Sequence, residues 1–441
     1  MANPTLKLPV IQNWSCHNCG GCCREHLIEI TEEEKRRIEQ QGWQVSDGIS
    51  MERPVIQKIA HGRYRLAHQD DGACVFLDEQ GLCRIHAKFG EPAKPLACRV
   101  YPYAYHPAGN RLAVSLRFSC PSVVQNLGQP VMEQAGTLQN LGSQVVAEKK
   151  TETAAPLIHR DSQHGPQQTE WSDFHRFLEA MDAAFADDTV HFAVRLMRVL
   201  SWMDLVAQSQ FQTIRGAKLD DFLELVSNAS VKAQPDNELP VHRPSRMGRV
   251  MFRLMTAQFA RHDTEAAVRA GLGHRFGLLT AALKFTTGLG TIPVLNGSAS
   301  VAKAFGSTDD GDSTSRQTAR FAAVEREFFC RQPEIDELLS RYFRVKIQGI
   351  HFCGPAHYNT TLIDGFHSLA LVYPVVMWWS RVRAVRNGRS MVTLTDVQAA
   401  LATVDHNFGY SPALGNYSAL HRVSLLAKLK QITALVGWYS R

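Results

Sequence analysis

The distribution of cysteine constrains this chain more than any other feature. Ten of its 441 residues are cysteine; eight of them precede residue 121, while Cys330 and Cys353 stand alone. The clustered residues are Cys16, Cys19, Cys22, Cys23, Cys74, Cys83, Cys98 and Cys120. Eight clustered thiols indicate either four disulfides in an exported protein or metal ligation in a reducing compartment.

The start of the chain favours metal ligation. The segment Met1-Ala2-Asn3-Pro4 is not followed by the basic and apolar regions of a signal peptide, so we expect a cytoplasmic protein. Because the cytoplasm keeps thiols reduced, the eight cysteines are expected to bind metal rather than to pair with each other.

The run Cys16-x2-Cys19-x2-Cys22-Cys23 carries the strongest signal. Cysteines two residues apart can wrap one metal, and Gly20 and Gly21 suit the tight loop that this requires. Three cysteines at this spacing are typical of ferredoxin-type runs, whose fourth ligand is remote and often followed by proline. Cys120-Pro121 matches that feature.

The remaining thiols would form a second site. Cys23, Cys74, Cys83 and Cys98 complete a second set of four, so the sequence predicts two four-sulfur sites that hold either zinc or an iron–sulfur cluster. His86 follows Cys83 by three residues and could replace one sulfur. Because Cys22 and Cys23 are adjacent, they would serve different sites, or one of them would be inert.

Local signals predict several short elements in the cysteine-rich block, residues 12–125. Thr31 and Glu34 form a capping box that starts a helix, which should end near Gly42. Residues 63–66 are expected to form a strand. Residues 74–77 and 82–86 are predicted to be two strands around a turn, and residues 101–105 and 111–118 a hairpin.

The rest of the chain is predicted to be helical. Residues 126–169 are polar and aperiodic, as in a linker. From residue 170 to 441, apolar residues recur at helical spacing, as in Phe192, Leu196 and Val199. The fold class is therefore mostly α: a small irregular α+β cysteine-rich metal-binding domain followed by an α-helical domain. The longest apolar stretch, residues 369–379, contains Pro374 and suits a buried helix better than a membrane span.

Composition adds two limits. The chain is 44% hydrophobic and 20% charged, which is typical of a globular protein. Its net charge of +6 is mild for this length and predicts no specific nucleic-acid partner.

The order of the motifs resembles a known family. The series is Trp14-x-Cys16-x2-Cys19-Gly20-x-Cys22-Cys23, Ile30-Thr31-x2-Glu34, Gly72-Ala73-Cys74-Val75-Phe76-Leu77, Cys83-Arg84-Ile85-His86 and Pro95-x2-Cys98-Arg99-x-Tyr101-Pro102. It is similar to the YkgJ-type cysteine-cluster family of zinc- or iron-chelating domains. The whole chain also resembles the flagellin lysine-N-methylase proteins, which pair such a cluster with a long helical region.

The cysteine pattern and the resemblance lead to two main hypotheses about function, beside a third, electron carriage by an exposed cluster. The first is a metal- or iron–sulfur-binding protein that methylates lysine on another protein, flagellin being the substrate, with S-adenosylmethionine as a further ligand. The second is a non-enzymatic zinc- or iron-binding module whose helical domain docks a protein partner. The chain offers no glycine-rich nucleotide loop: Gly288-Leu289-Gly290 follows a helical stretch and lacks a third glycine.

A methylating enzyme needs a group that accepts the proton of the lysine. The catalytic residue is left open by the sequence. Tyrosine or histidine near the metal domain is expected to serve, and Tyr101, Tyr103, Tyr105 and His106 are candidates. His406 and His421, on predicted C-terminal helices, are further candidates, although core or surface roles are commoner for such residues.

Overall fold

Local signals around Thr31 organise the N-terminal lobe, residues 21–100. In the computed structural model, Thr31 caps α2 (Glu32–Gln40) with the predicted capping box. A small sheet pairs β4 (Arg63–Leu66) with β2 (Glu29–Ile30) and β3 (Ile56–Ala60). The short helices of the lobe are α1 (Gly21–Glu25), η1 (Val45–Asp47), α3 (Arg84–Phe89), η2 (Glu91–Ala93) and α4 (Leu96–Val100). A core around Ile38, Trp43 and Phe76 holds them together.

The structure describes residues 5–50, 52–148, 154–161, 165–234, 239–261, 272–293, 318–328 and 332–441. Cys330 lies outside these ranges.

The predicted strand pair at residues 74–77 and 82–86 is wrong. Leu77 and Cys83 form only an isolated bridge, and the chain enters α3 at Arg84. Asp78 turns the chain by accepting hydrogen bonds from the backbone N–H groups of Gln80 and Leu82. A five-residue apolar alternation is too short to distinguish strand from helix, and tertiary contacts decided the outcome.

The predicted hairpin is confirmed. Strand β5 (Tyr103–Ala108) pairs antiparallel with β6 (Arg111–Leu116), and β1 (Thr5–Lys7) joins β6 in parallel. Gly109 makes the tight turn with φ +68°, and an added Cβ there would meet Trp171 at 2.9 Å. Helix α5 (Pro121–Val124) follows β6 after a short loop that contains Cys120.

Helices make up most of the remaining structure, so the mostly α fold class is confirmed. The longer ones are α7 (Trp171–Ala186), α8 (Phe192–Ala207), α9 (Ala217–Ala233), α10 (Arg246–Phe259), α12 (Leu272–Thr287), α15 (Pro333–Gln348), α16 (Leu362–Arg386), α17 (Leu394–Asn407), α19 (Tyr417–Lys428) and α20 (Gln431–Tyr439). Short turns form α14 (Phe321–Val324), η4 (Pro355–His357) and α18 (Pro412–Gly415).

Helix α16 runs through the core of the helical part. By length and composition this one helix of the described residues could cross a membrane, but 83% of its most apolar window is buried inside the molecule. Burial among other helices is the environment that the sequence predicted for it.

Residues 126–169, expected as a linker, contain regular structure in their described part. Helix α6 (Ala135–Glu148) follows η3 (Val131–Gln134), and β7 (His159–Asp161) pairs with β8 (Gly165–Gln167). Leu138 and Leu141 of α6 are buried in the same core as the β5–β6 hairpin and the helices. The segment from β5 to β8 therefore packs as part of the helical body.

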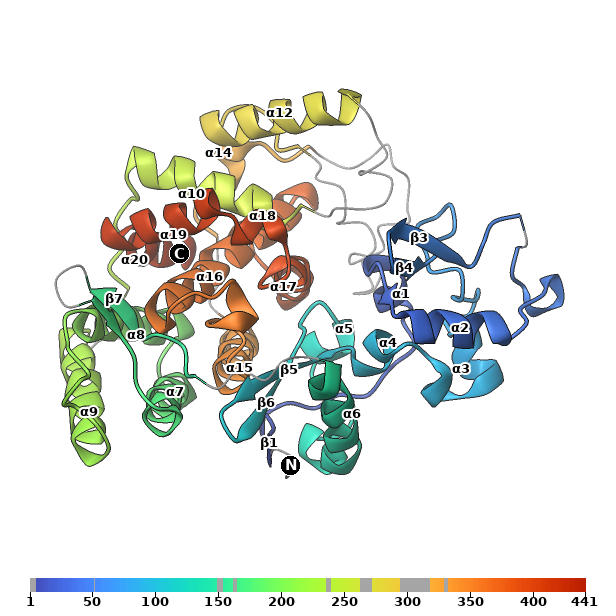
Figure 1. Cartoon of the computed structure of the whole chain (residues 1–441). Coiled ribbons are helices and arrows are strands. Elements are labelled where there is room, and N and C mark those ends of the chain that lie inside the picture. The colour runs from blue at the N-terminus through green and yellow to red at the C-terminus, as the bar shows by residue number, and fades with distance from the viewer. Residues whose placement is uncertain are drawn as a thin grey trace.

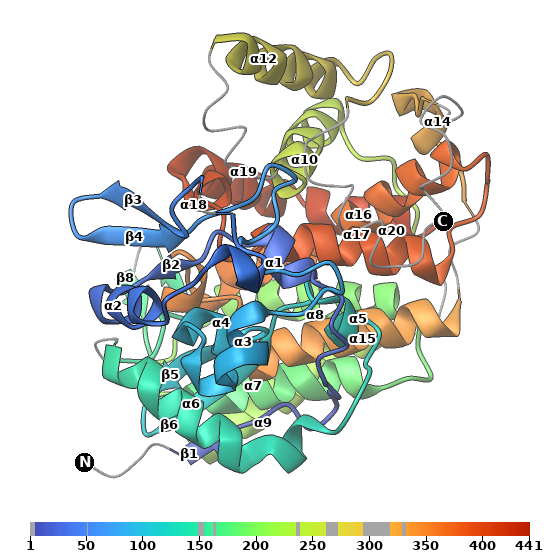
Figure 2. The same ribbon diagram turned by 90° about the vertical axis from the view of Figure 1, so that its right-hand side faces the viewer.

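The N-terminal lobe lies beside this helical body. In Figure 1 the lobe, with α2, α3, β3 and β4, stands at the right, and the helices from α7 to α20 stand at the left. Helices α4 and α5 and the β5–β6 hairpin lie between them, and Figure 2 shows the same arrangement from the side of the lobe. The cysteines lie at this boundary.

Candidate metal centre

All eight clustered cysteines line one cavity of about 1100 Å³. They come from separate parts of the chain: the loop before α1, α1 itself, the turn after β4, the start of α3, α4 and the loop before α5. All eight are free thiols. The structure thus brings every predicted ligand to one place, although they span more than one hundred residues of sequence.

The first four cysteines are shaped by one tight loop. Gly20 precedes α1 with φ +66°, which is the left-handed conformation that glycine adopts easily, whereas Gly21 begins the helix. The Sγ atoms of Cys22 and Cys23 lie 4.0 Å apart in α1. The loop also packs closely on a second turn, because a Cβ at Gly81 would lie 2.6 Å from the carbonyl oxygen of Asn18.

Contacts inside the lobe position the next three thiols, those of Cys74, Cys83 and Cys98. The N–H of Cys74 donates to the carbonyl oxygen of Cys23 at 2.7 Å, which joins α1 to the turn after β4. Cys83 stands at the N-terminus of α3. Cys98 lies in α4, whose first N–H, that of Leu96, donates to Glu34 of α2 at 2.7 Å.

Cys120 reaches the cavity from the other direction. It stands immediately before Pro121, the first residue of α5. Its loop follows β6 and belongs to the core that includes the helices. The cavity is therefore enclosed by the N-terminal lobe on one side and by the helical body on the other.

Burial and neighbouring thiols raise the pKa of Cys19, Cys22, Cys74, Cys98 and Cys120, which favours their protonated form when no cation is present. Burial raises the pKa of Cys74 to about 12 and that of Cys120 to about 11. The pKa of Cys98 is also well above its ordinary value because of burial, and that of Cys22 is raised first by its hydrogen bond with Cys23 and then by burial. A bound cation would reverse this balance, since thiolates are the metal ligands.

Neighbouring thiols also raise one another's pKa. Cys74, Cys22 and Cys83 act on Cys98. Cys22 and Cys16 act on Cys19, and Cys19 acts on Cys120. Cys22 of α1 therefore acts on both Cys98 and Cys19.

The donors suit zinc or an iron–sulfur cluster, both of which take four thiolates. Within the ranges given above, no three histidine, cysteine or acidic side chains stand close enough to hold one metal ion. The thiols are chemically suitable metal ligands, but they must move closer together before they can coordinate one ion. His86 also lines the cavity, as a replacement ligand would.

The helical body supplies an aromatic and cationic wall. His406 at the end of α17 stacks on His26, with ring centroids 5.0 Å apart and planes 9° apart. The Arg117 guanidinium lies 3.9 Å from the ring centroid of Tyr410 and donates to the carbonyl oxygen of His406 at 3.2 Å. These side chains and Tyr101 line the same cavity as the cysteines.

The candidate proton acceptors separate into two groups. Tyr101, Tyr103 and His406 line the cavity. Tyr105 instead donates to the carbonyl oxygen of Leu138. His106 packs against His351, with ring centroids 4.8 Å apart, and His421 stacks on Tyr417.

Basic residues offset the thiols in an arrangement that the sequence did not reveal. Lys94 lines the cavity and lowers the pKa of Cys22 and Cys98, although burial outweighs it. Of the arginines that follow a cysteine, Arg24 pairs with Asp71 and Arg99 with Glu91. No sequence signal marks Lys94, Arg117 or Tyr410, because lysine, arginine and tyrosine are common and only the fold shows which of them line the cavity.

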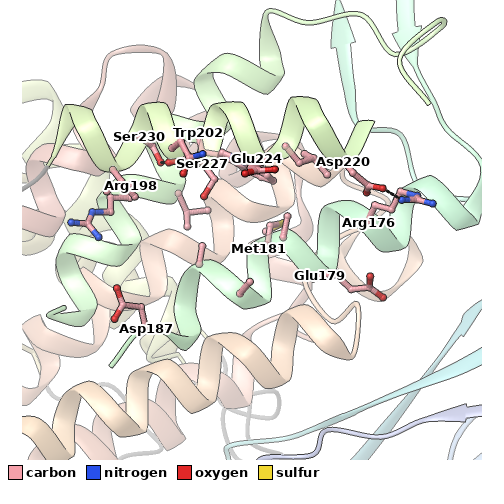
Figure 3. A pocket seen from close by; sticks show the side chains of 17 residues that line it. Arg176, Glu179, Met181, Asp187, Arg198, Trp202, Asp220, Glu224, Ser227 and Ser230 are labelled. Atoms are coloured by element: carbon pink, nitrogen blue, oxygen red, sulfur yellow. Dashed lines mark hydrogen bonds and ion pairs between the residues drawn. The ribbon is translucent and has the colours of Figure 1, made fainter. Parts of the chain in front are cut away.

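A second cavity, of about 470 Å³, lies between α7, α8 and α9 (Figure 3). The charged residues that line it are Arg176, Glu179, Asp187, Arg198, Asp220 and Glu224, and Arg176 pairs with Asp220 at one end. None of the residues that line it is a cysteine or a histidine.

Comparisons with known proteins agree with this location. Residues 15–121 match the CxxCxxCC family, described as a "Putative zinc- or iron-chelating domain". The lysine-N-methylases of Salmonella choleraesuis (strain SC-B67) and Salmonella typhimurium (strain LT2) are each 24% identical over 136 residues, which cover 26% of this chain and 30% of the relative. The flagellar biosynthetic protein FliU of Salmonella muenchen is 36% identical over 56 residues, 13% of this chain and 33% of the relative.

The chain thus spans about a third of the length of the curated relatives that it matches. No solved structure matches it. The resemblance of the N-terminal quarter to the cysteine-cluster family, first indicated by the order of its motifs, is confirmed by the match over residues 15–121.

Proposed function

We propose that the eight cysteines bind zinc or iron–sulfur clusters in two sets of four, and that the protein methylates lysine on another protein at this cavity. The observation that carries the proposal is the convergence of eight free thiols on one cavity. One set would contain Cys74, Cys83, Cys98 and one of the two thiols of α1. The second set would contain Cys16, Cys19, Cys120 and the other thiol of α1.

The methylase part of the proposal is supported by the partial similarity to two lysine-N-methylases. The methyl donor would be S-adenosylmethionine, and flagellin is the proposed protein substrate. The lysine nitrogen would attack the methyl carbon, a carbon–nitrogen bond would form, and the carbon–sulfur bond of the sulfonium would break. The nitrogen must lose a proton, because only a neutral amine has the lone pair to attack.

The cavity wall suggests which groups take that proton. Burial raises the pKa of Tyr101 well above its ordinary value, and Cys120 adds to the effect, so this phenol stays protonated and suits a hydrogen-bond donor. His26 and His406 line the same wall, and each imidazole has a ring nitrogen that can act as the proton acceptor. Four thiolates around a divalent ion would leave a net negative charge beside them, and an iron–sulfur cluster would supply electron transfer when bound.

The first test is metal analysis of anaerobically purified protein, with visible absorption to distinguish a cluster from zinc. We expect two four-thiolate sites per chain. A Cys16→Ala, Cys19→Ala double variant should lose at least half of the metal because too few thiolates remain in one set. Cys353→Ala is the matched control, since Cys353 is buried outside the cavity. Full metal content in the double variant would contradict the proposal.

The methylase activity is tested separately. Metal-loaded protein is incubated with S-adenosylmethionine and flagellin, and lysine methylation is followed by mass spectrometry. Methyl transfer that occurs with the wild-type protein and disappears in the double variant supports the methylase proposal. Full metal loading without binding of S-adenosylmethionine would favour the second hypothesis, a metal-binding module that docks a protein partner. The description of the matched family as a chelating domain is the observation that favours this alternative.

A further inference from the structure

The loop that carries Cys120 is held from the helical body by two buried charges. Lys346 of α15 and Asp405 of α17 form an ion pair at 2.7 Å, and the side chains of both are fully buried. Lys346 also donates to the carbonyl oxygen of Leu116 at 3.2 Å. Asp405 accepts a hydrogen bond at 3.1 Å from the backbone N–H of Ser119, the residue before Cys120.

A third buried charge holds the chain just beyond Cys120. The guanidinium of Arg341 donates to the carbonyl oxygens of Val123 at 2.8 Å and Val124 at 2.6 Å, at the end of α5. It also donates to the side chain of Gln12 at 2.8 Å. Arg341 is only 8% exposed, so these contacts are shielded from water. The loop and α5 are thus fixed on both sides of Cys120 by side chains of α15 and α17.

The thiols of the other set are positioned inside the N-terminal lobe. Cys74 is tied to Cys23 by a backbone hydrogen bond and is buried in the small core of the lobe. Cys98 lies on α4, whose first turn is held by Glu34 of α2. The two sets therefore differ in the part of the molecule that orients them.

We propose that Lys346, Asp405 and Arg341 are positioning residues for Cys120, so that the helical body completes one metal set while the lobe builds the other. The proposal rests on the metal binding proposed above. A positioning role requires a direct contact with the loop that carries the ligand. Asp405 makes that contact, and its neighbour His406 lines the cavity. A shift of α17 would therefore displace Cys120 and the opposite wall together.

The test compares three variants of the full chain. Asp405→Ala removes the acceptor of Ser119 and leaves Lys346 unpaired. The double variant Lys346→Met, Asp405→Leu removes both charges, which avoids the cost of an unpaired buried charge and keeps the fold. Arg341→Met releases the end of α5. Circular dichroism checks that each variant is folded before it is loaded with zinc.

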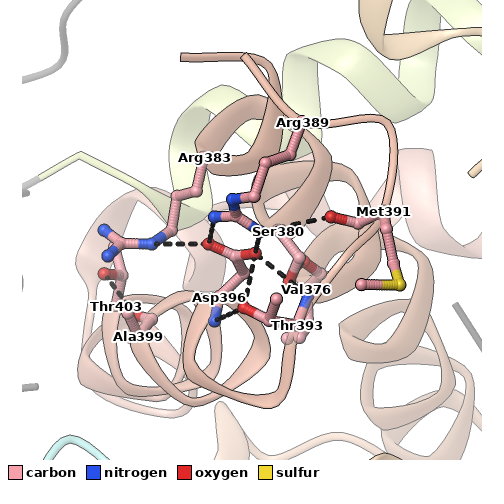
Figure 4. A network of polar contacts seen from close by, with 9 residues as sticks. All are labelled: Val376, Ser380, Arg383, Arg389, Met391, Thr393, Asp396, Ala399 and Thr403. Carbon is pink, nitrogen blue, oxygen red and sulfur yellow. Dashed lines mark hydrogen bonds and ion pairs between the residues drawn. The ribbon is translucent and has the colours of Figure 1, made fainter. Parts of the chain in front are cut away.

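A second buried carboxylate on the same helix gives a matched control. Asp396 lies at the N-terminus of α17, the end opposite Asp405, and pairs with both guanidinium nitrogens of Arg389 at 2.6 and 2.9 Å (Figure 4). Arg383 approaches it at 3.8 Å, and Asp396 is 2% exposed. Asp396→Asn therefore weakens α17 at a site that does not contact the Cys120 loop.

Two readouts distinguish positioning from general loss of stability. Zinc per chain is measured, and the cysteines that remain reactive are mapped by alkylation and mass spectrometry. In all three variants we expect zinc to fall from two to one per chain. Cys16, Cys19 and Cys120 should become alkylated, whereas Cys74, Cys83 and Cys98 should stay protected. The Asp396→Asn control should retain both ions.

The contrary outcomes are separable. Wild-type protein that binds no zinc and no iron would overturn the proposed function and this inference with it. Wild-type protein with two ions, and folded variants that also keep two, would overturn the positioning role alone. Equal alkylation of both sets in the double variant, or equal losses in the Asp396→Asn control, would show a merely structural role and would also overturn it.

Discussion

Burial controls the charge of individual histidines in the helical body. The pKa of His175 falls to about 4 because burial removes water from the ring, and Lys7 and Arg111 add to the effect. The pKa of His357 falls to about 3, mainly through burial and then through Lys346. Both rings are therefore neutral in the folded protein at neutral pH, while an unfolded chain would protonate them as the pH falls below about 6.5.

This difference predicts a loss of stability in weak acid. Between about pH 6.5 and 4 the unfolded chain binds more protons than the native one. The free energy of unfolding therefore has its full value above this window and declines as the pH falls through it. One such histidine contributes a slope of up to about 1.4 kcal/mol per pH unit. His175→Phe, which keeps the contact with Trp171, should reduce the slope by that amount in urea denaturation at several pH values.

The exposed His421 provides the control through His421→Phe. The prediction fails if His175→Phe and wild type lose equal stability between pH 7.5 and about pH 5.

At the scale of residues, the sequence predicted the thiols but not their surroundings. Cysteine spacing and the redox argument were enough to select eight residues that line one cavity. Lys94, Arg117 and Tyr410 could not be selected, because lysine, arginine and tyrosine are common and only tertiary packing shows which of them line the cavity. Which thiols share a metal stays a prediction.

At the scale of elements, Glu34 connects two helices of the lobe. One carboxylate oxygen accepts a hydrogen bond from the backbone N–H of Thr31 at 2.8 Å, as part of the capping box of α2. The other accepts from the N–H of Leu96 at 2.7 Å, at the start of α4. A helix-capping residue thereby also fixes the helix that carries Cys98.

This double role predicts unequal effects of two variants. Thr31→Ala removes only the cap and should cost about 1 kcal/mol of stability. Glu34→Ala also loses the charged hydrogen bond to α4. This loss should add about 1.5 kcal/mol of destabilisation, the low end for a charged hydrogen bond, because the carboxylate is partly exposed. Glu34→Ala should in addition increase alkylation of Cys98 in zinc-loaded protein, whereas Thr31→Ala should leave Cys98 protected. Equal effects on stability and on Cys98 would disprove the connection.

Element prediction succeeded where several signals agreed. The start of α2 carried both partners of its capping box, and the β5–β6 hairpin carried two apolar runs around Gly109. It failed at α3, where Cys83 to His86 carried only a short alternation. Residues 126–169 were polar enough to suggest a linker, yet Leu138 and Leu141 of α6 bury themselves against the body. Sparse apolar residues give weak periodicity even when a helix is packed.

At the scale of the whole molecule, two cores meet at one cavity. The small core holds the lobe, and the large core extends from the β5–β6 hairpin to α20. Cys120 belongs to the large core and Cys74 to the small one. A domain boundary near residue 125 stays a prediction, but the hairpin and α5 already share the core of the helices. Sequence patterns could not show this, because they record which residues are apolar and not which core receives them.

The shared cavity predicts that metal binding stabilises the entire molecule. Metal bound to the native state alone adds about 2.7 kcal/mol when its free concentration is about 100 times Kd. Because Cys120 is anchored through Lys346, Asp405 and Arg341 to α15 and α17, the gain should reach the helices. Removal of metal by a chelator should lower the melting temperature of the helical signal in circular dichroism, in one transition.

The Cys16→Ala, Cys19→Ala variant is the control, since the chelator should lower its melting temperature less than that of the wild type. Independent behaviour of the two cores would give the opposite pattern. The helical signal would then melt at the same temperature with and without metal, while only a minor early transition, from the lobe, responded to the chelator. Coupling through the Cys120 loop requires that the major transition move, because the helices that hold this loop contribute most of the signal.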